Sequence, residues 1–391
     1  MKITFCIPSK NNLRYLKTSI NSIRENSSIE HDIVVYLDTD NDGTEEWLVE
    51  NNITYLKNKT GIPKGIAFGY NRCIEAAKTD IVCTFHADMY MAKGFDTAIL
   101  KYLAPGKVVC GTRIEPPLHP KGKEKIVEDF GMYPEDFKKE KFDQYVQELV
   151  SINKDATTRG IFAPWAVYKE DVLKIGMHDE RFHSYHEDSD IFNRFVLSGY
   201  EIVQTWEGFV YHLTCRGGQF QDGVEQVTTD SSFHTMRDRA FEHYLRKWGS
   251  PMYNDHYHHP IIPSKYDIAF RITNCKEALL KVLEPWCSAI SSDASYAKWL
   301  EDEQNSTQFN MLKRVKPWNA GLDNDVVVEF DASKLTQQTF NLLHQLPQIL
   351  ANQEEVGEFE LDIFRIKIKA LNTYEDRLVS LNDPYYTNQL L

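Results

Sequence analysis

The sequence predicts an α/β protein whose larger, N-terminal domain contains a mainly parallel, Rossmann-like sheet with flanking helices. Within the first 85 residues, apolar runs of strand length alternate with segments of helical periodicity, and this order requires crossover connections between parallel strands. The alternation restarts at Tyr266, after a proline-containing linker at 260–263, with strands expected at 268–272, 326–330 and 359–368 and helices at 276–283 and 336–350. We therefore expect a first domain at residues 1–258 and a smaller C-terminal α/β domain at 264–391.

The elements of the first domain follow in order from these patterns. Pro8 ends the first strand, and Thr44 begins the second helix. Strands are expected at 3–7, 32–37, 53–56, 80–85, 108–112, 161–167, 202–205 and 208–211, with helices at 13–23, 44–48, 66–77, from 187 onward and at 233–248. Residues 117–145 contain six lysines and seven acidic side chains, so we expect them to form a solvated, mobile face.

Composition limits the classes of function. The 391 residues include 44 Lys and Arg against 57 Asp and Glu, a net charge of −13 without a basic tail, which disfavours nucleic acid as a partner. The seven cysteines are scattered and none forms a C-x-x-C pair, which favours a reducing compartment over a disulfide framework or a zinc site. No signal-peptide pattern and no apolar run of spanning length are present, so we expect a cytoplasmic protein without a transmembrane segment.

The strand at 80–85 ends in His86 and Asp88. Residues two apart in an extended chain point the same way, so both side chains are expected at the carboxyl edge of the sheet, where open α/β sheets bind ligands. A carboxylate there can hold a divalent cation, which in turn can hold a diphosphate. The alternative is a plain strand end followed by a solvated turn. The chain has no glycine-rich phosphate loop, so a bound nucleotide would need a metal ion or side chains to balance its charge.

Three other polar stretches are candidates for function. The turn at 38–44 directs carboxylates to the same edge, and it resembles a calcium loop except that the closing glutamate is missing. Glu187 and Asp188 open a helix, where acidic groups could instead simply complement the helix dipole. The histidines at 256–259 suggest a metal site, but they lie in a linker without helical spacing. The C-terminal domain offers no cluster of catalytic groups, so a scaffold or partner-binding role is the default.

With Asp38, Asp88, the pair Glu187–Asp188 and His212 in this order, the first 250 or so residues resemble the family 2 inverting glycosyltransferases of the GT-A fold. The resemblance implies a mixed, mainly parallel sheet and a metal-dependent transfer from a nucleotide-diphosphate sugar. By this resemblance Asp88 occupies the last position of the D-x-D motif and is a metal ligand, with His212 as a further ligand of Mn²⁺ or Mg²⁺.

The resemblance also assigns donor and acceptor residues. Donor-binding residues would be Pro8, Ser9, Asp38, Asn71, His86 and Arg216. Asp38 would read the base, His86 stands where the motif has its first aspartate, and Arg216 lies in a glycine-containing loop, 213–224, that resembles a lid. On the acceptor side, Asp188 matches the general base, beside Glu187, and Trp165 falls where such enzymes place acceptor contacts. We expect Asp188 to be ionised at neutral pH.

Taken together, the sequence predicts a hexosyltransferase-type enzyme that moves a sugar, from a UDP-sugar by preference, to the hydroxyl of a glycan or other acceptor. Two alternatives stay open. A nucleotidyltransferase would use the same metal and nucleotide edge but attack the α-phosphate, and a non-catalytic sugar-nucleotide or glycan-binding module would have no use for a carboxylate pair facing the acceptor. A DNA acceptor is disfavoured by the acidic charge.

Overall fold

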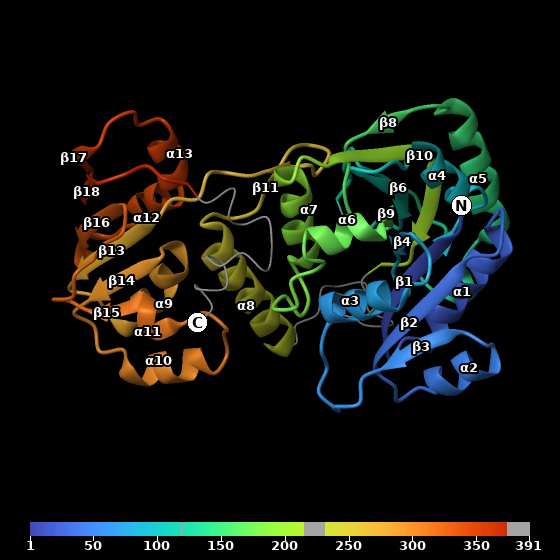
Figure 1. The fold of residues 1–391 in the computed structure, drawn as a ribbon, viewed down its shortest axis with the longest axis horizontal. Coiled ribbons are helices and arrows are strands. Elements are labelled where there is room, and N and C mark those ends of the chain that lie inside the picture. Colours follow the sequence, from blue (N-terminus) through green and yellow to red (C-terminus); the bar gives the residue numbers. More distant parts are fainter. Residues whose placement is uncertain (119, 215–230, 374–391) are drawn as a thin grey trace. The chain divides into compact units, whose positions relative to one another are not determined.

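The structure is a computed structural model that describes residues 1–118, 120–214 and 231–373. The chain forms two compact units (Figure 1). The first comprises Met1–Arg237 with Asn254–Pro260, and the second comprises Asp238–Tyr253 with the residues from Ile261 onward. The expected domain boundary between 258 and 264 stays a prediction. Among the described residues, no helix combines the length and apolar character needed to cross a bilayer.

The sheet of the first unit is mixed and mainly parallel. Its strands are β1 (Ile3–Lys10), β2 (Asp32–Thr39), β3 (Thr54–Lys57), β4 (Ile81–Thr84), β5 (Met89–Met91), β6 (Lys107–Glu115), β7 (Lys125–Val127), β8 (Thr157–Thr158), β9 (Trp165–Tyr168) and β10 (Glu201–His212). They run in the order β3-β2-β1-β4-β9-β6-β10-β5, with β7 on β6 and β8 on β10. β5, β8 and β9 are antiparallel to their partners. The arrangement confirms the predicted fold class.

Helices flank this sheet. They are α1 (Leu13–Asn26), α2 (Thr44–Glu50), α3 (Ile66–Ala76), α4 (Phe95–Tyr102), α5 (Lys139–Ile152), α6 (Lys169–Lys174) and α7 (Glu187–Leu197), with the short η1 (Pro134–Asp136). Because parallel crossovers are right-handed and β4 lies on the other side of β1 from β2, α1 and α3 cover opposite faces (Figure 1). Burial on both faces explains why β1 and β4 read as continuous apolar runs.

The predicted elements differ from the structure in several places, and the first strand continues past Pro8 to Lys10. The two strands expected at 202–205 and 208–211 are one strand, β10, with a register shift against β6 between Gln204 and Phe209. Part of the mixed charge run is ordered, since α5 buries Phe142 and Val146 against the sheet. The strand expected at 161–167 is limited to β9.

The second unit has its own sheet and core. Its strands β13 (Ile268–Thr273), β14 (Ala289–Ser292), β15 (Val315–Pro317), β16 (Val326–Asp331), β17 (Gly357–Leu361) and β18 (Phe364–Ile368) run in the order β15-β14-β13-β16-β18-β17. Its helices are α9 (Glu277–Leu283), η2 (Glu284–Trp286), α10 (Ala297–Gln304), α11 (Met311–Arg314), η3 (Ala332–Lys334), α12 (Gln337–His344) and α13 (Leu346–Ala351). α8 (Ser231–Trp248) and the short strands β11 (Tyr253–Asn254) and β12 (Pro260–Ile261) lie where the chain passes between the units.

Two of the sequence expectations for this unit were too coarse. The strand expected at 359–368 is the hairpin of β17 and β18, which turns at Asp362 with a φ of 54°. The helix expected at 336–350 is divided into α12 and α13, and Pro347 lies in the first turn of α13, where a proline costs no hydrogen bond. The unit is nevertheless the smaller α/β domain that the sequence predicts.

Candidate active site

The carboxyl ends of the central strands bring three potential metal ligands together. His86 and Asp88 follow β4, and His212 is the last residue of β10. The turn after β4 is held by β5, whose Met89 is paired with His212, and by the hydrogen bond from the Leu213 amide to the Asp88 carbonyl at 2.9 Å. The backbone therefore fixes both sides of this cluster before any ion is bound.

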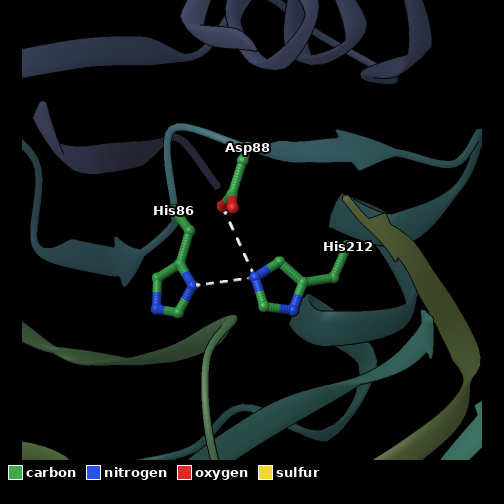
Figure 2. A group of neighbouring side chains, drawn as sticks. All are labelled: His86, Asp88 and His212. Carbon is green, nitrogen blue, oxygen red and sulfur yellow. Dashed lines mark hydrogen bonds and ion pairs between the residues drawn. The ribbon is translucent and has the colours of Figure 1, made fainter. Parts of the chain in front are cut away.

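The three side chains point at one another (Figure 2). His212 Nε2 lies 3.4 Å from an Asp88 carboxylate oxygen and 3.4 Å from His86 Nδ1, and one ligand atom from each residue fits within 4.8 Å of the others. Asp88 and His212 are buried, with exposed fractions of 6% and 5%. The structure thus brings together the two expected ligands and adds His86, which the sequence placed only in the donor pocket. No other group of three such side chains within the described ranges could share an ion.

The electrostatics of the cluster separate its two histidines. Burial, and after it the charge of the neighbouring His212, lower the pKa of His86 to about 4, so its imidazole is neutral and free to act as a ligand. Burial also disfavours the charged form of His212, but the carboxylates of Asp88 and Glu115 outweigh it and raise its pKa to about 9. The surroundings therefore favour positive charge on the ring of His212.

These residues fit a divalent cation. Two imidazole nitrogens and one carboxylate oxygen converge within bonding reach of a single point, and the surroundings already stabilise positive charge there. Imidazole ligands suit transition metals, whereas Mg²⁺ prefers an all-oxygen shell. The donor set therefore fits Mn²⁺ better than Mg²⁺.

Glu115, at the end of β6, is a residue that the sequence analysis missed. It is 1% exposed, and its carboxylate lies 3.0 Å from His212 Nδ1, 2.8 Å from Lys125 Nζ and 3.4 Å from an Arg113 guanidinium nitrogen. Burial would raise the pKa of Glu115, but Arg113, His212 and Lys125 together hold it well below its ordinary value. The strand expected at 108–112 stopped three residues short, although continued alternation would have carried it to this edge.

Glu187 and Asp188 begin α7. The preceding residues Tyr185 and His186 both have positive φ, 72° and 63°, and this uncommon backbone aims the first turn of the helix. The Asp188 carboxylate accepts the Ser189 amide at 2.7 Å. Glu187 Oε2 is buried and has no hydrogen-bond partner among the described residues.

Burial changes the titration of this carboxylate pair. It raises the pKa of Glu187 to about 8, with a further contribution from the charge of Asp188, so Glu187 holds a proton at neutral pH. Burial also raises the pKa of Asp188, against the amide of Ser189 and the nearby charges of His186 and Arg113, which lower it. Burial thus opposes the helix-start effect from which we expect Asp188 to be ionised, and that expectation stays a prediction.

Asp38, at the end of β2, organises the loop that follows β3. Its carboxylate accepts the backbone amides of Lys64 and Gly65 at 2.7 and 3.0 Å and the side-chain amide of Asn58 at 3.1 Å. Gly65 has a φ of 88°, and a Cβ there would lie 2.0 Å from the carbonyl oxygen of His183. The next amide, that of Ile66, donates to the same carbonyl at 2.8 Å. Asp38 and the segment leading to Glu187 are thus joined through one loop.

Two predicted donor residues lie near this edge in β1. Ser9 is 4% exposed, and its hydroxyl has no hydrogen-bond partner in the part of the chain that the structure describes. Pro8 is half-buried, and its ring contacts the backbone of α3 at Gly69, where a Cβ would lie 2.8 Å away. Arg216, the remaining donor-side prediction on a loop, lies outside the described residues, as does most of the loop at 213–224.

The side chains of Asn71 and Trp165, predicted to contact the donor and the acceptor, make other contacts in the structure. Both sides of the Asn71 amide are engaged, with Nδ2 donating to the His178 carbonyl at 2.8 Å and to Glu180 at 3.0 Å, and Oδ1 accepting the His178 amide at 2.9 Å. Asn71 therefore clamps the segment before Glu187 rather than facing a donor. Trp165 is 2% exposed and packs against Phe192 and other core rings, which removes it from an acceptor surface.

The histidines at 256–259 do not form a metal site in the described structure. His258 Nε2 lies 3.6 Å from the buried carboxylate of Glu124, and its ring packs edge-on against Phe162 at 5.6 Å. Phe162 has a φ of 91°, unusual for an aromatic residue, and the Arg113 guanidinium lies over its ring at 5.1 Å. These contacts place Phe162 beside the charged groups of the site, a second position that the sequence did not indicate.

Comparison with known proteins agrees with this geometry. Residues 4–161 match the family model described as glycosyl transferase family 2. No curated protein matches the chain.

Solved structures with a similar chain path include GalNAc-T7 with UDP, GalNAc and Mn²⁺, at 11% identity and a TM-score of 0.45, where 63% of this chain covers 47% of that one. They also include residues 1–349 of S. aureus TarS, at 14% identity and a TM-score of 0.38, where 54% of this chain covers 60% of that one. The chain therefore spans less than two thirds of each of these structures.

Proposed function

We propose that the protein is a metal-dependent inverting glycosyltransferase that uses a nucleotide-diphosphate sugar, with a UDP-sugar favoured. The observation that carries the proposal is the convergence of His86, Asp88 and His212 at the carboxyl edge of the sheet. This edge is where open α/β sheets bind nucleotides, and the chain has no phosphate loop there. The leaving diphosphate therefore needs another source of positive charge.

His86, Asp88 and His212 would hold the ion, and Mn²⁺ is favoured over Mg²⁺ because two of the three ligands are imidazoles. The bound cation would neutralise the charge that develops on the leaving diphosphate. The chain's own part is to keep His86 neutral and to keep Asp88 and His212 in place through β5 and β10.

Donor binding is proposed for Asp38, Pro8 and Ser9. Asp38 already accepts two backbone amides from the loop at 61–65, so it shapes the pocket wall as well as offering a carboxylate to a base. Ser9 contributes a buried hydroxyl whose hydrogen-bonding capacity is unused by the described residues. An unused buried hydroxyl costs stability, and a bound ligand would recover that cost.

Asp188 is proposed as the general base and Glu187 as its neutral partner at neutral pH. A carboxylate that takes the proton of the acceptor hydroxyl as it attacks contributes about 10²–10⁴-fold to the rate. Because Glu187 holds a proton, it can donate a hydrogen bond to the acceptor without competing for the same proton. Direct attack by the acceptor on the anomeric carbon gives inversion. The acceptor is proposed to be the hydroxyl of a glycan or similar molecule.

The six described cysteines are all free thiols, which supports a reducing compartment, and we propose the cytoplasm. The test of the proposal is a panel of sugar nucleotides, scored by nucleotide release with Mn²⁺, with Mg²⁺ and with EDTA. We expect hydrolysis or transfer with Mn²⁺ that EDTA abolishes and that Asp88→Asn abolishes without unfolding the protein. Proton NMR of the product reports the anomeric configuration. A product that retains sugar phosphate would instead identify a nucleotidyltransferase, and binding without turnover would identify a binding module.

A further inference from the structure

We propose that Glu115 is a positioning residue of the metal centre, which holds the ring of His212 so that Nε2 faces the point shared with His86 and Asp88. The inference rests on the proposed function for the presence of the ion, but it concerns only the chain's own side chains. It assigns a role to a buried residue outside the ligand set.

Both carboxylate oxygens of Glu115 contact hydrogen-bond donors. One carboxylate oxygen lies 3.0 Å from His212 Nδ1 and 3.4 Å from the Arg113 guanidinium, and the other lies 2.8 Å from Lys125 Nζ. The side chain is 1% exposed, so water does not compete for these partners. Both oxygens are therefore fixed by neighbours that themselves belong to strands.

Three adjacent strands determine this arrangement. β6 pairs in parallel with β10, which places Ile114 opposite Tyr211 and so brings Glu115 beside His212. β6 also pairs in parallel with β7, which places Arg113 opposite Lys125. The short strand β7 thus delivers the lysine that meets the second oxygen of Glu115. Since strands are the stiffest parts of the fold, the carboxylate is held in place independently of any ligand.

Ligand chemistry explains what this placement does. A neutral imidazole that binds a metal through Nε2 must carry its hydrogen on Nδ1, and a hydrogen-bond acceptor at Nδ1 selects that form and fixes the plane of the ring. Glu115 is that acceptor. Arg113 and Lys125 balance its charge, so the carboxylate orients His212 without adding an uncompensated negative charge beside Asp88.

The isosteric variant Glu115→Gln tests whether Glu115 determines which ring nitrogen of His212 carries the hydrogen. Lys125 and Arg113 can both only donate, and Lys125 is the closer of the two, at 2.8 Å from one oxygen against 3.4 Å for Arg113 from the other. The amide oxygen would therefore face Lys125, and the amide NH₂ would face His212 Nδ1. That arrangement favours the imidazole form with hydrogen on Nε2, which cannot bind a metal there. Adding Lys125→Met releases the amide to turn over and accept from Nδ1 again. The double variant should therefore bind metal better than the single variant, although it lacks one more native contact.

The experiment measures Mn²⁺ binding to the full chain by calorimetry, without donor or acceptor. We expect Glu115→Gln to weaken binding by about 10–100-fold, as is typical for partners of metal-bound histidines, and the double variant to recover part of the loss. Glu124→Gln is the matched control, because Glu124 is also a buried carboxylate near a histidine, His258, but does not contact His212. It should leave Mn²⁺ affinity unchanged. Thermal unfolding in EDTA checks that each variant is folded.

If Glu115→Gln does not fold, Glu115→Asp replaces it, since aspartate keeps the charge for Lys125 and Arg113 but is one methylene too short to reach Nδ1. Binding should then weaken by about fivefold or more. Wild-type affinity in the folded Glu115 variant, or an equal loss in Glu124→Gln, would overturn the positioning role and leave the proposed function standing. Failure of the unaltered chain to bind Mn²⁺ would overturn both.

Discussion

The raised pKa of Glu187 predicts that the protein loses stability as the pH rises, and that Glu187→Gln removes much of this loss. The carboxyl has an ordinary pKa of 4.5 and a folded-state pKa of about 8, caused first by burial and then by the charge of Asp188. The folded state therefore binds this proton more tightly than the unfolded state. The resulting stability is fully present below pH 4.5 and is lost as the pH rises through 8.

The magnitude follows from the same two values. At about 1.4 kcal/mol for each pH unit, the difference between 4.5 and about 8 sets an upper bound of about 5 kcal/mol on the change in unfolding free energy. Two other groups titrate in the same range. Burial raises the pKa of Glu242 to about 7, and the carboxylates near His212 raise its pKa to about 9 although burial opposes them. Both contribute to the pH dependence of the unfolding free energy of the unaltered protein. The contribution of Glu187 is therefore measured as the difference in unfolding free energy between the unaltered protein and Glu187→Gln.

The assay is urea denaturation in metal-free buffer at pH 5, 7 and 9, for the unaltered chain and for Glu187→Gln. Glutamine keeps the shape of the protonated acid but cannot ionise, so the gap between the two unfolding free energies should shift in favour of the variant between pH 5 and pH 9. Asp188→Asn is a useful companion, because removing its charge should lower the pKa of Glu187 and flatten the slope in part. Parallel pH profiles for the unaltered chain and Glu187→Gln would refute the assignment of a buried, protonated Glu187.

Three further outcomes are expected. Asp188→Asn should leave the donor dissociation constant nearly unchanged and reduce transfer by about 10²-fold or more; lost donor binding would move Asp188 to the donor pocket. Gly65→Ala should weaken donor binding and destabilise the protein by about 1–3 kcal/mol, because its φ of 88° and the 2.0 Å approach to the His183 carbonyl leave no room for a Cβ; a wild-type denaturation midpoint would contradict this. A fragment of residues 238–391 should fold on its own and one of 264–391 should not, as monitored by circular dichroism, since the shorter fragment lacks part of the second unit; equal folding of both would support the boundary expected from the sequence.

The fold was largely predictable from the sequence, and particular residues show why. Strands buried on both faces, such as β1 and β4, produce continuous apolar runs that the sequence shows directly. The polar residues after β4 mark its end, whereas β1 continues past Pro8 to Lys10. The antiparallel strand β9 and the register shift in β10 leave no such signal, because they depend on partners far along the chain.

Site residues could be predicted only where they belong to a motif that is visible in the sequence. Asp88 and His212 were expected to share a metal ion because a spaced pattern of polar residues resembles a known family, and the structure brings their side chains together. The role of Asp188, which has the same origin, stays a prediction. Glu115 was missed because its role depends on the pairing of β6 with β10 and β7, which brings together residues 97 and 10 positions apart. Trp165 was assigned to the acceptor because exposure cannot be read from residue type, and its ring is 2% exposed.

The contact between Gly65 and His183 has a consequence for engineering. The loop that Asp38 holds and the segment that leads into Glu187 touch backbone to backbone, through the Ile66 amide and the His183 carbonyl at 2.8 Å. Neither segment can be lengthened, shortened or exchanged without refitting the other. A programme that grafts loops to change the sugar nucleotide would therefore have to transplant residues 61–66 together with residues 178–186, as one cassette with two discontinuous parts.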